Sequence, residues 1–256
     1  DKMSELLEKQ LKDLNGDARE TARNAGAAVI PVIQPYLRSE SEEQRSLALE
    51  CLAEIKSDEA INALVQGLED PDVNVRKTAV LLLHAHYSPA AKDKLEELVS
   101  KSPYEWVRGN AALVLGRIGN PSSASPIKLQ LPLEANEQAK KQMTLAIARL
   151  EEGEARQQVL AHLSDPDPRQ RYNAIEDFEY IKVPALLPKL DPLLKDTAEV
   201  RNVGTEPYPV WHRVCDRAVE AVPAITGRPL PFRTGFRNYT PDEINRVREQ
   251  IGRSKP

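Results

Sequence analysis

The side chains best suited to chemistry in this chain are four histidines and two cysteines, and their spacing argues against a catalytic or metal site. His84 and His86 are two positions apart on a predicted helix, so their side chains would diverge by about 200°, whereas metal ligands on one helix need a spacing of three or four. His212 and Cys215 have the i, i+3 spacing that allows contact on a helix, but no third group that would orient a nucleophile is evident. We therefore expect no catalytic residues and no metal ligands.

Other signatures of catalysis or of cofactor binding are absent from the sequence. Paired metal ions need convergent imidazole and carboxylate ligands, which His-Glu dipeptides at a repeat spacing would supply, and none of the histidines precedes a glutamate. A chain with 11 glycines leaves little room for a glycine-rich phosphate loop, and Cys51 and Cys215 are too far apart to form a Cys-x-x-Cys motif. The formal charge of -4 argues against nucleic acid as a general partner. We expect no cofactor, no nucleic-acid partner and no membrane span, since the apolar stretches are far shorter than the roughly 20 residues that a span needs.

A basic residue recurs every 31 or 32 positions, and this repeat predicts the helices that form most of the chain. A small or apolar residue follows it after three positions, and further apolar residues follow after seven and usually ten. On a helix these positions fall within an arc of about 80°, which is a stripe able to pack against a neighbouring helical hairpin. The basic residues of the series are Arg45, Arg76, Arg108, Lys140 and Arg171.

Capping residues and breaks in the series indicate where the helices begin and where the regular repeat fails. Most of the repeated helices follow an N-capping side chain, whereas Tyr104 interrupts that series and Ser102 is expected to substitute. Residues 121–133 predict a short or distorted second helix. An insertion of about a dozen residues between Leu194 and Val210 is expected to form loops on one rim. Beyond it, Thr240 is expected to cap a last helix.

The motifs at 70–79, 104–119 and 165–174 resemble HEAT repeats, specifically the short bacterial HEAT-like or bilin-lyase-type repeats. This resemblance extends over roughly residues 17–226 and implies an all-α fold, a right-handed α-solenoid of about seven HEAT-like helical hairpins, which is an alpha-alpha superhelix. In this family the recurring basic residue pairs with an acid of a turn or with a backbone carbonyl of an adjoining unit. We expect two regions, a repeat solenoid over 1–226 and a C-terminal extension over 227–256 that contains a terminal helix and caps the array.

Aromatic residues are only 5% of the chain, and their grouping gives the candidates for partner binding. Aromatic side chains and arginine are enriched at interface hot spots, because they combine contact area with a polar group. The same residues in the extension would also serve a cap. The candidate partner-binding residues are Tyr104, Trp106, Tyr208, Trp211, Arg233 and Phe236.

We therefore predict a noncatalytic scaffold or adaptor that binds another protein or peptide. The alternative is a lyase-type or cofactor-handling HEAT-like protein that binds a tetrapyrrole. Cys51 and Cys215 lie in apolar helical patterns and are expected to be buried free thiols, which favours a cytoplasmic location. An exported bacterial protein whose signal has been removed remains an open alternative, because the chain begins with Asp1. The partner, the oligomeric state and the binding face stay open.

Overall fold

The computed structural model describes residues 1–253, and its contacts divide the chain into two compact units. Unit 1 is Asp1–Leu150 and unit 2 is Glu151–Pro256. The predicted boundary at residue 226 falls inside unit 2, and the division into solenoid and extension stays a prediction. No described helix is long and apolar enough to cross a membrane.

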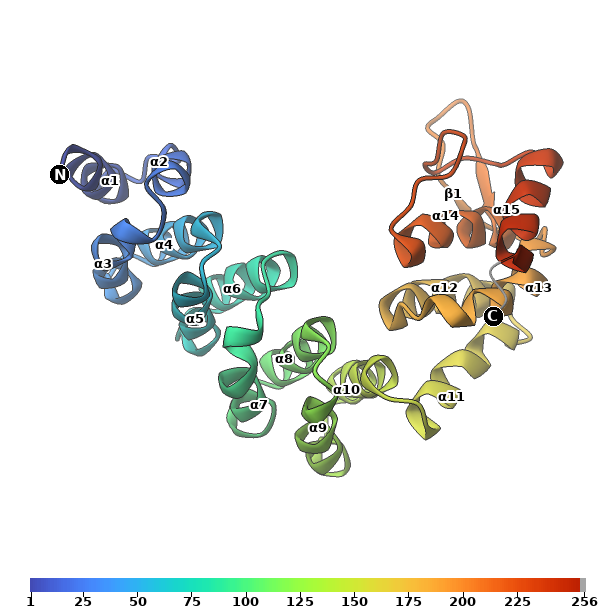
Figure 1. Ribbon diagram of the computed structural model, residues 1–256, viewed down its shortest axis with the longest axis horizontal. Coiled ribbons are helices and arrows are strands. Elements are labelled where there is room, and N and C mark those ends of the chain that lie inside the picture. Colours follow the sequence, from blue (N-terminus) through green and yellow to red (C-terminus); the bar gives the residue numbers. More distant parts are fainter. Residues whose placement is uncertain (254–256) are drawn as a thin grey trace. The chain divides into compact units, whose positions relative to one another are not determined.

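Unit 1 is a double layer of short helices (Figure 1). The even-numbered helices α2, α4, α6, α8 and α10 form one layer and pack side by side in chain order, while α3, α5, α7 and α9 form the other. The segment 121–133 is a short helix between two 3-10 turns, as predicted from its prolines. The elements are α1 (Lys2–Lys12), α2 (Ala18–Ala25), α3 (Ile30–Ile33), α4 (Glu42–Ile55), α5 (Asp58–Val65), α6 (Val73–Ala85), α7 (Lys92–Lys101), α8 (Glu105–Ile118), α9 (Ala124–Gln130) and α10 (Glu137–Leu150).

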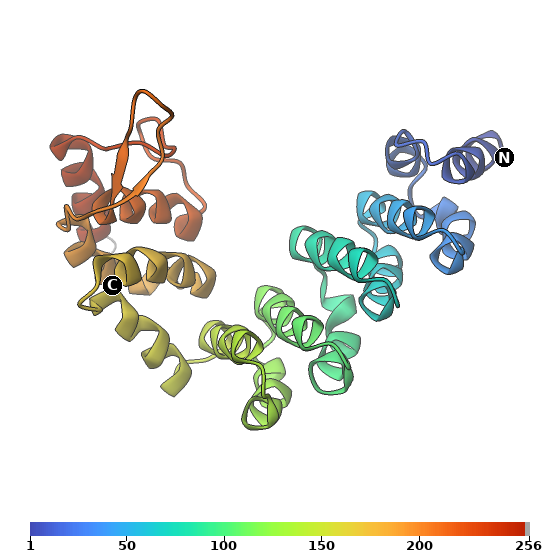
Figure 2. The same cartoon turned by 180° about the vertical axis from the view of Figure 1, so that it is seen from behind.

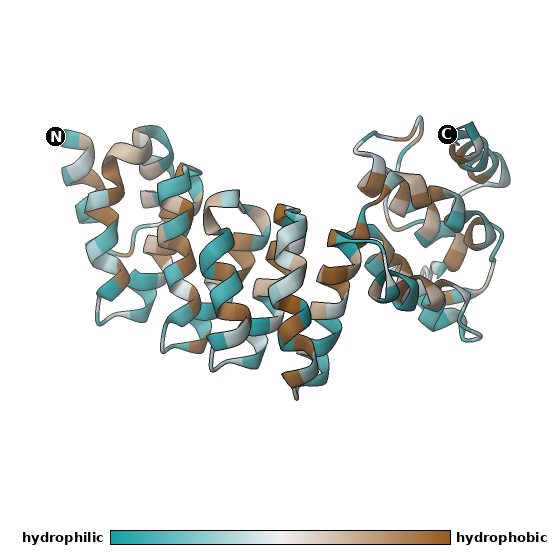
Figure 3. Cartoon of the chain, turned by 60° about the horizontal axis from the view of Figure 1, so that its bottom comes forward, coloured by the Kyte–Doolittle hydropathy of each residue, from teal (hydrophilic) through white to brown (hydrophobic). Residues whose placement is uncertain are grey.

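The predicted apolar stripe is the core between these helices. Along each helix, hydrophobic and hydrophilic stretches alternate, as an amphipathic helix requires (Figure 3). The positions three and seven after the basic residue are buried in every regular repeat, with Leu52, Leu83 and Leu115 at 0% exposure. The all-α solenoid class expected from the periodicity is thus confirmed.

An arginine clamp forms at three of the five members of the basic series, and Arg45 shows its pattern. The Arg45 guanidinium contacts Asp70, at the end of the following helix, with an Nε–Oδ2 distance of 2.9 Å. It also donates to the carbonyl oxygen of Ser39, in the turn before its own helix, at 2.7 Å. A single side chain therefore joins the turn before its helical hairpin to the turn after it. The same contacts join Arg108 to Glu134 and Ser102, and Arg171 to Asp196 and Asp165.

The acid of each clamp also fixes its own turn. Asp70 Oδ1 accepts from the backbone N–H of Asp72 at 2.9 Å, and Glu134 Oε1 accepts from that of Asn136 at 3.2 Å. The carboxylate that binds the arginine therefore shapes the entry to the next helix, where Asp72 and Asn136 are the predicted capping residues. This confirms the expectation that the basic series serves packing.

Two members of the basic series depart from the clamp. Arg76 has no acid at the matching position, and its guanidinium stacks on the Tyr104 ring at 3.7 Å from the centroid while it donates to the carbonyls of Asp70 and Pro71. Lys140 instead pairs with Glu137 on its own helix. Tyr104 thus takes the place of an acid in the clamp.

Unit 2 begins with the same helical pattern and then departs from it. The insertion expected to form loops is an antiparallel pair of strands in which Arg201 lies opposite His212 and Asn202 opposite Trp211. The expectation of loops was therefore right for residues 203–210 and wrong for β1, and this hairpin stands out beyond the helices of unit 2 (Figure 2). The elements are α11 (Glu154–Ala161), α12 (Pro168–Ile181), α13 (Asp191–Leu194), β1 (Glu199–Asn202), β2 (Trp211–Arg213), α14 (Val214–Thr226) and α15 (Pro241–Arg253).

The C-terminal segment returns to the core of unit 2. Tyr239, Val247 and Ile251 are almost fully buried there beside residues of α12 and α14. The predicted capping box is present, because the Thr240 N–H donates to Glu243 and the Glu243 N–H donates to the Thr240 hydroxyl.

The Arg108–Glu134 clamp makes unit 1 sensitive to acid. The Glu134 side chain has no exposed surface, and the Arg108 guanidinium lowers its pKa to about 2. We expect Glu134→Gln to lower the free energy of unfolding by about 2 kcal/mol at neutral pH, because a charge-assisted contact is lost. The folded pKa lies below the usual 4.5, so the contribution is complete above pH 4.5 and is lost as the pH falls to about 2.

Urea unfolding of the wild type and of this variant across that pH range measures the effect. The difference between them should shrink toward pH 2. Glu137→Gln is the matched control, since the Glu137 side chain is 87% exposed, and it should cost less than about 0.5 kcal/mol. Equal losses at Glu134 and Glu137 would contradict the clamp.

Candidate binding site in unit 2

The six candidate partner-binding residues fall into three places. Tyr104 and Trp106 belong to the start of α8 in unit 1, Tyr208 and Trp211 to the hairpin, and Arg233 and Phe236 to the loop before α15. The first pair is separate from the others, whereas the hairpin and the loop of unit 2 meet.

Tyr104 and Trp106 mainly serve the repeat. Tyr104 carries the Arg76 guanidinium on its ring, and its backbone N–H donates to the Ser102 hydroxyl. Ser102 does not replace the missing cap as expected, because no described side chain accepts from the N–H groups of the first turn of α8. Trp106 is 38% exposed, and its carbonyl accepts from the Asn110 side chain. Only the outer part of the Trp106 ring is left for a partner.

The hairpin and the C-terminal loop are joined by Asp216, a buried carboxylate that sequence reasoning missed. It accepts from the backbone N–H of Arg213 and of Tyr239 at 2.9 Å each, and from the Asn238 side chain at 2.8 Å. The Arg213 guanidinium also donates to it at 2.8 Å. Burial alone would raise the pKa of Asp216, but the Arg213 guanidinium and these donors lower it overall.

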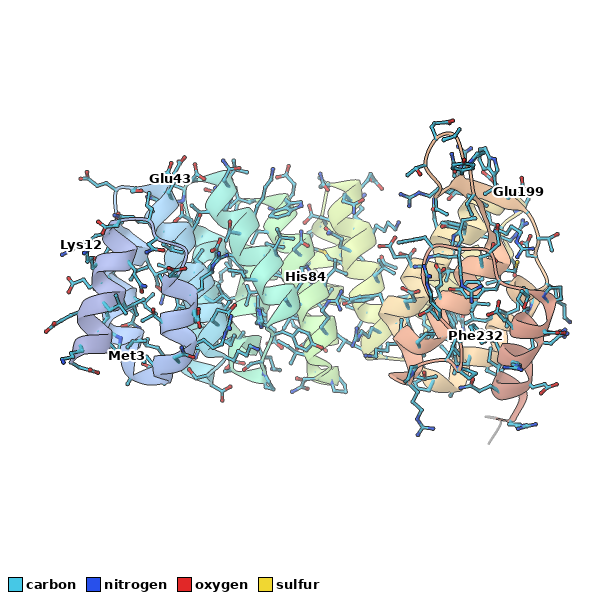
Figure 4. The ribbon with its side chains drawn as sticks, turned by 90° about the horizontal axis from the view of Figure 1, so that it is seen from above. Met3, Lys12, Glu43, His84, Glu199 and Phe232 are labelled. Carbon is cyan, nitrogen blue, oxygen red and sulfur yellow. The ribbon has the colours of Figure 1, made fainter. Side chains whose placement is uncertain are left out.

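This junction leaves aromatic side chains exposed on the surface of unit 2. Trp211 is 49% exposed, Tyr208 77% and Phe236 68%, and Arg233 is exposed in the same loop as Phe236. By contrast, Phe232 lies against the Tyr239 ring at 5.8 Å between centroids, and Figure 4 shows it on unit 2. The loop therefore points some of its rings into the unit and leaves Phe236 outside.

A hollow of about 450 Å³ opens beside Phe236, between three parts of unit 2 that are distant in sequence. Helix α12 contributes Tyr172 and α14 contributes Ala224, while β1 adds Arg201. The remaining lining residues are polar or charged: Asn173, Glu176, Glu179, Arg217 and Glu220.

His212 lies behind this hollow and connects its walls. The ring is fully buried, with Nδ1 at 2.7 Å from the Tyr172 hydroxyl and Nε2 at 3.1 Å from Glu220 Oε2. The Tyr239 hydroxyl donates to the same Glu220 oxygen at 3.1 Å. The Phe236 ring packs edge-on against the imidazole at 5.9 Å. A neutral His212 satisfies both contacts if Tyr172 donates to Nδ1 and Nε2–H donates to Glu220.

The structure corrects the reading of His212 and Cys215 as neighbours on one helix. His212 is in β2 and Cys215 in α14, and the imidazole contacts Tyr172 and Glu220 instead. Burial raises the pKa of the Cys215 thiol to about 11, so the thiol is un-ionised at neutral pH. Burial also raises the pKa of Tyr172.

The charges of the hollow are partly satisfied within it. Arg217 pairs with Glu179, and Glu220 receives the contacts from His212 and Tyr239. Among the described residues, neither the Arg201 side chain nor the Glu176 side chain forms a hydrogen bond or an ion pair. These two side chains are the charges that a ligand would meet.

A second hollow, in unit 1, is less suited to recognition. It has a volume of about 510 Å³ beside α4 and α6, and its acids include Glu50 and Asp72. Glu50 pairs with Arg19 at 3.3 Å, and Asp72 caps α6. No aromatic side chain is among the described residues that line it.

The histidines of unit 1 are engaged in packing. His84 lies on α6 (Figure 4), with Nε2 at 3.0 Å from Asn110 Oδ1 and Nδ1 at 3.2 Å from Arg117 Nε. Burial lowers the pKa of His84. Both ring nitrogens of His84 therefore have a partner within unit 1. Within residues 1–253 no cluster of three or more potential ligands is placed to hold a metal ion.

Comparisons with known proteins agree with this architecture. The family model for HEAT repeats matches residues 4–80 and 30–116. One solved structure, the complex of CpcE and CpcF of phycocyanin lyase from Nostoc sp. PCC7120, aligns over 98% of this chain and 94% of its own, with a TM-score of 0.51 and 18% identity. Human deoxyhypusine hydroxylase aligns over 98% of this chain and 94% of its own, with a TM-score of 0.38 and 17% identity.

A curated relative, epoxyqueuosine reductase of Bacillus subtilis (strain 168), is 39% identical over 67 residues. This match covers 26% of the chain and only 17% of the length of the reductase. The repeat motifs, the helical double layer and the family match together show that the chain is a HEAT-repeat protein.

The different surroundings of Leu115 and Phe236 predict different costs of truncation. Leu115→Ala empties a fully buried position and should lower the free energy of unfolding by about 2 to 5 kcal/mol. Phe236→Ala should cost less than about 1 kcal/mol, because most of that ring is already exposed. Thermal unfolding of both variants compares the two, and equal losses would show that Phe236 is a structural residue.

Asp216 should be the most sensitive polar position of unit 2. We expect Asp216→Asn to lower the free energy of unfolding by about 3 kcal/mol, since the Arg213 charge loses its buried partner. Denaturation followed by tryptophan fluorescence measures the loss. Asp242→Asn, in the exposed first turn of α15, is the control and should cost less than about 1 kcal/mol. A similar loss of unfolding free energy for both variants would show that Asp216 does not hold the hairpin and the C-terminal loop together.

Proposed function

We propose that the chain is a noncatalytic interaction protein that holds a segment of another protein in the hollow of unit 2. The observation that carries this proposal is the position of Phe236, an exposed ring at the edge of a hollow that contains unpaired charges. Exposed aromatic side chains beside arginine are typical of interface hot spots. Trp211 and Tyr208 are further exposed aromatic side chains of unit 2, on the hairpin.

The chemistry of the hollow supports binding over nucleophilic catalysis. Tyr172 is the potential nucleophile in the lining of the hollow, and burial raises the pKa of its hydroxyl above the usual value. The Cys215 thiol is fully buried, with a pKa of about 11. A catalytic nucleophile needs the opposite adjustment, because a lowered pKa or an adjacent base activates it. The contacts of His212 hold two walls of the hollow together and suit a preformed binding site.

The rival function is the handling of a tetrapyrrole, and its support is the fold shared with the phycocyanin lyase complex. That complex joins two proteins, which also suits a protein partner for this chain. Mixing the purified chain with a panel of tetrapyrroles distinguishes the two functions. A tight stoichiometric complex with a shifted absorbance band would contradict the proposal.

Capture of a partner from the cells that naturally make this chain tests the proposal. The chain is compared with the double variant Arg201→Gln, Phe236→Ser, which alters two exposed positions at the hollow. We expect the variant to retain at most about a tenth of the bound partner, because the loss of two hot-spot contacts costs more than about 1.4 kcal/mol.

The control for this experiment is Leu129→Ser in unit 1. Leu129 is 74% exposed, so its replacement removes a similar apolar surface far from the hollow in sequence. It should leave capture unchanged. Loss of the partner from the Leu129 variant, with full capture by the double variant, would move the binding site to unit 1.

A further inference from the structure

Arg201 and Glu176 give the hollow one positive and one negative charge that nothing in the described chain neutralises. From this arrangement we propose that the hollow binds a peptide segment with an acidic and a basic side chain around an apolar one. The inference rests on the proposed function, and it specifies the chemistry of the partner segment.

The positive side of the hollow is formed around Tyr172. Arg201 and Arg217 both line the hollow together with Tyr172. Arg217 is committed to Glu179, whereas Arg201 has all its N–H donors available. An arginine with a free planar fork of donors binds a carboxylate through two hydrogen bonds.

The negative side is formed by Glu176, one helical turn beyond Tyr172 on α12. Its side chain is exposed and carries no partner among the described residues. The other acids of the hollow are already engaged, Glu179 by Arg217 and Glu220 by His212 and Tyr239. A basic group of the ligand therefore meets Glu176.

The unpaired charges of Arg201 and Glu176 favour a ligand that carries both a positive and a negative group over a ligand with charges of one sign. A purely acidic ligand would pair with Arg201 and be repelled by Glu176, and a purely basic ligand would meet the reverse. A ligand that carries both charges satisfies both groups, which is the complementarity that confers specificity on interfaces.

Phe236 provides an apolar contact in the lining of the same hollow. Its ring packs edge-on against His212, and 68% of it remains exposed. The outer surface of the ring is available to an apolar or aromatic side chain of the ligand. An aromatic residue between the acid and the base would place its ring there.

Isothermal titration of the full chain with blocked tripeptides tests this inference. The probes are acetyl-Glu-Phe-Lys-amide, its reversed sequence, and analogues in which Gln replaces Glu, Lys or both. At low ionic strength we expect a peptide with both charges to bind about fivefold more tightly than either single-charge analogue, and the neutral analogue to bind more weakly still.

Two single variants assign the charges to their partners. Arg201→Gln should weaken binding of the dipolar peptide about fivefold and leave the base-only analogue unchanged. Glu176→Gln should give the mirror-image result with the acid-only analogue. Glu199→Gln, on the same strand as Arg201 but outside the lining of the hollow, is the control and should change neither (Figure 4). Circular dichroism melting of each variant verifies that it is folded.

A single-charge analogue that binds as tightly as the dipolar peptides would overturn the inference, as would no binding by any probe at millimolar concentration. The same holds if the Glu199 variant loses affinity as much as the other two. These outcomes leave the proposed function to the capture experiment, which uses a natural partner and replaces Arg201 and Phe236 together.

Discussion

The repeats of this protein depend on an arginine that ties two turns together. In the Arg108 clamp, the guanidinium joins the buried Glu134 carboxylate to a carbonyl on the opposite side of the repeat, and Glu134 in turn shapes the entry to α10. A buried carboxylate is costly unless its charge and its hydrogen bonds are satisfied. The spacing of 31 or 32 residues is therefore the length of one repeat, which consists of two helices and two turns and brings the next basic residue to the matching position.

Because the repeated residues serve packing, the proposed function assigns recognition to the positions where the repeat is interrupted. The hairpin supplies Arg201 and His212, and the C-terminal loop supplies Phe236. Both are fixed to α14 by Asp216, while α12 provides the remaining wall of the hollow. An ordinary HEAT-like pair of helices thus becomes a site through two added segments.

Much of the fold could be predicted from local sequence, whereas the site could not. Helix starts and the buried stripe follow from residue types at fixed spacing, and even Tyr104 was identified as a break in the capping series. The pairing of the basic series was expected only from the resemblance to HEAT repeats. The strands β1 and β2 are only four and three residues long, too short to show a reliable alternation. The contact of His212 with Tyr172 spans 40 positions, and no local pattern encodes it. Phe236 was found through its residue type, but Arg201, Arg217 and Glu220 carry no signal beyond their charge.

A double-mutant cycle at Arg108 and Glu134 tests the clamp most directly. Unfolding free energies of the wild type, Arg108→Met, Glu134→Gln and the double variant give the coupling energy of the pair. The contacts at 2.7 and 2.8 Å and the full burial of the carboxylate predict a coupling of about 2 kcal/mol or more. A coupling below about 0.5 kcal/mol, the value of an ordinary surface pair, would contradict the account.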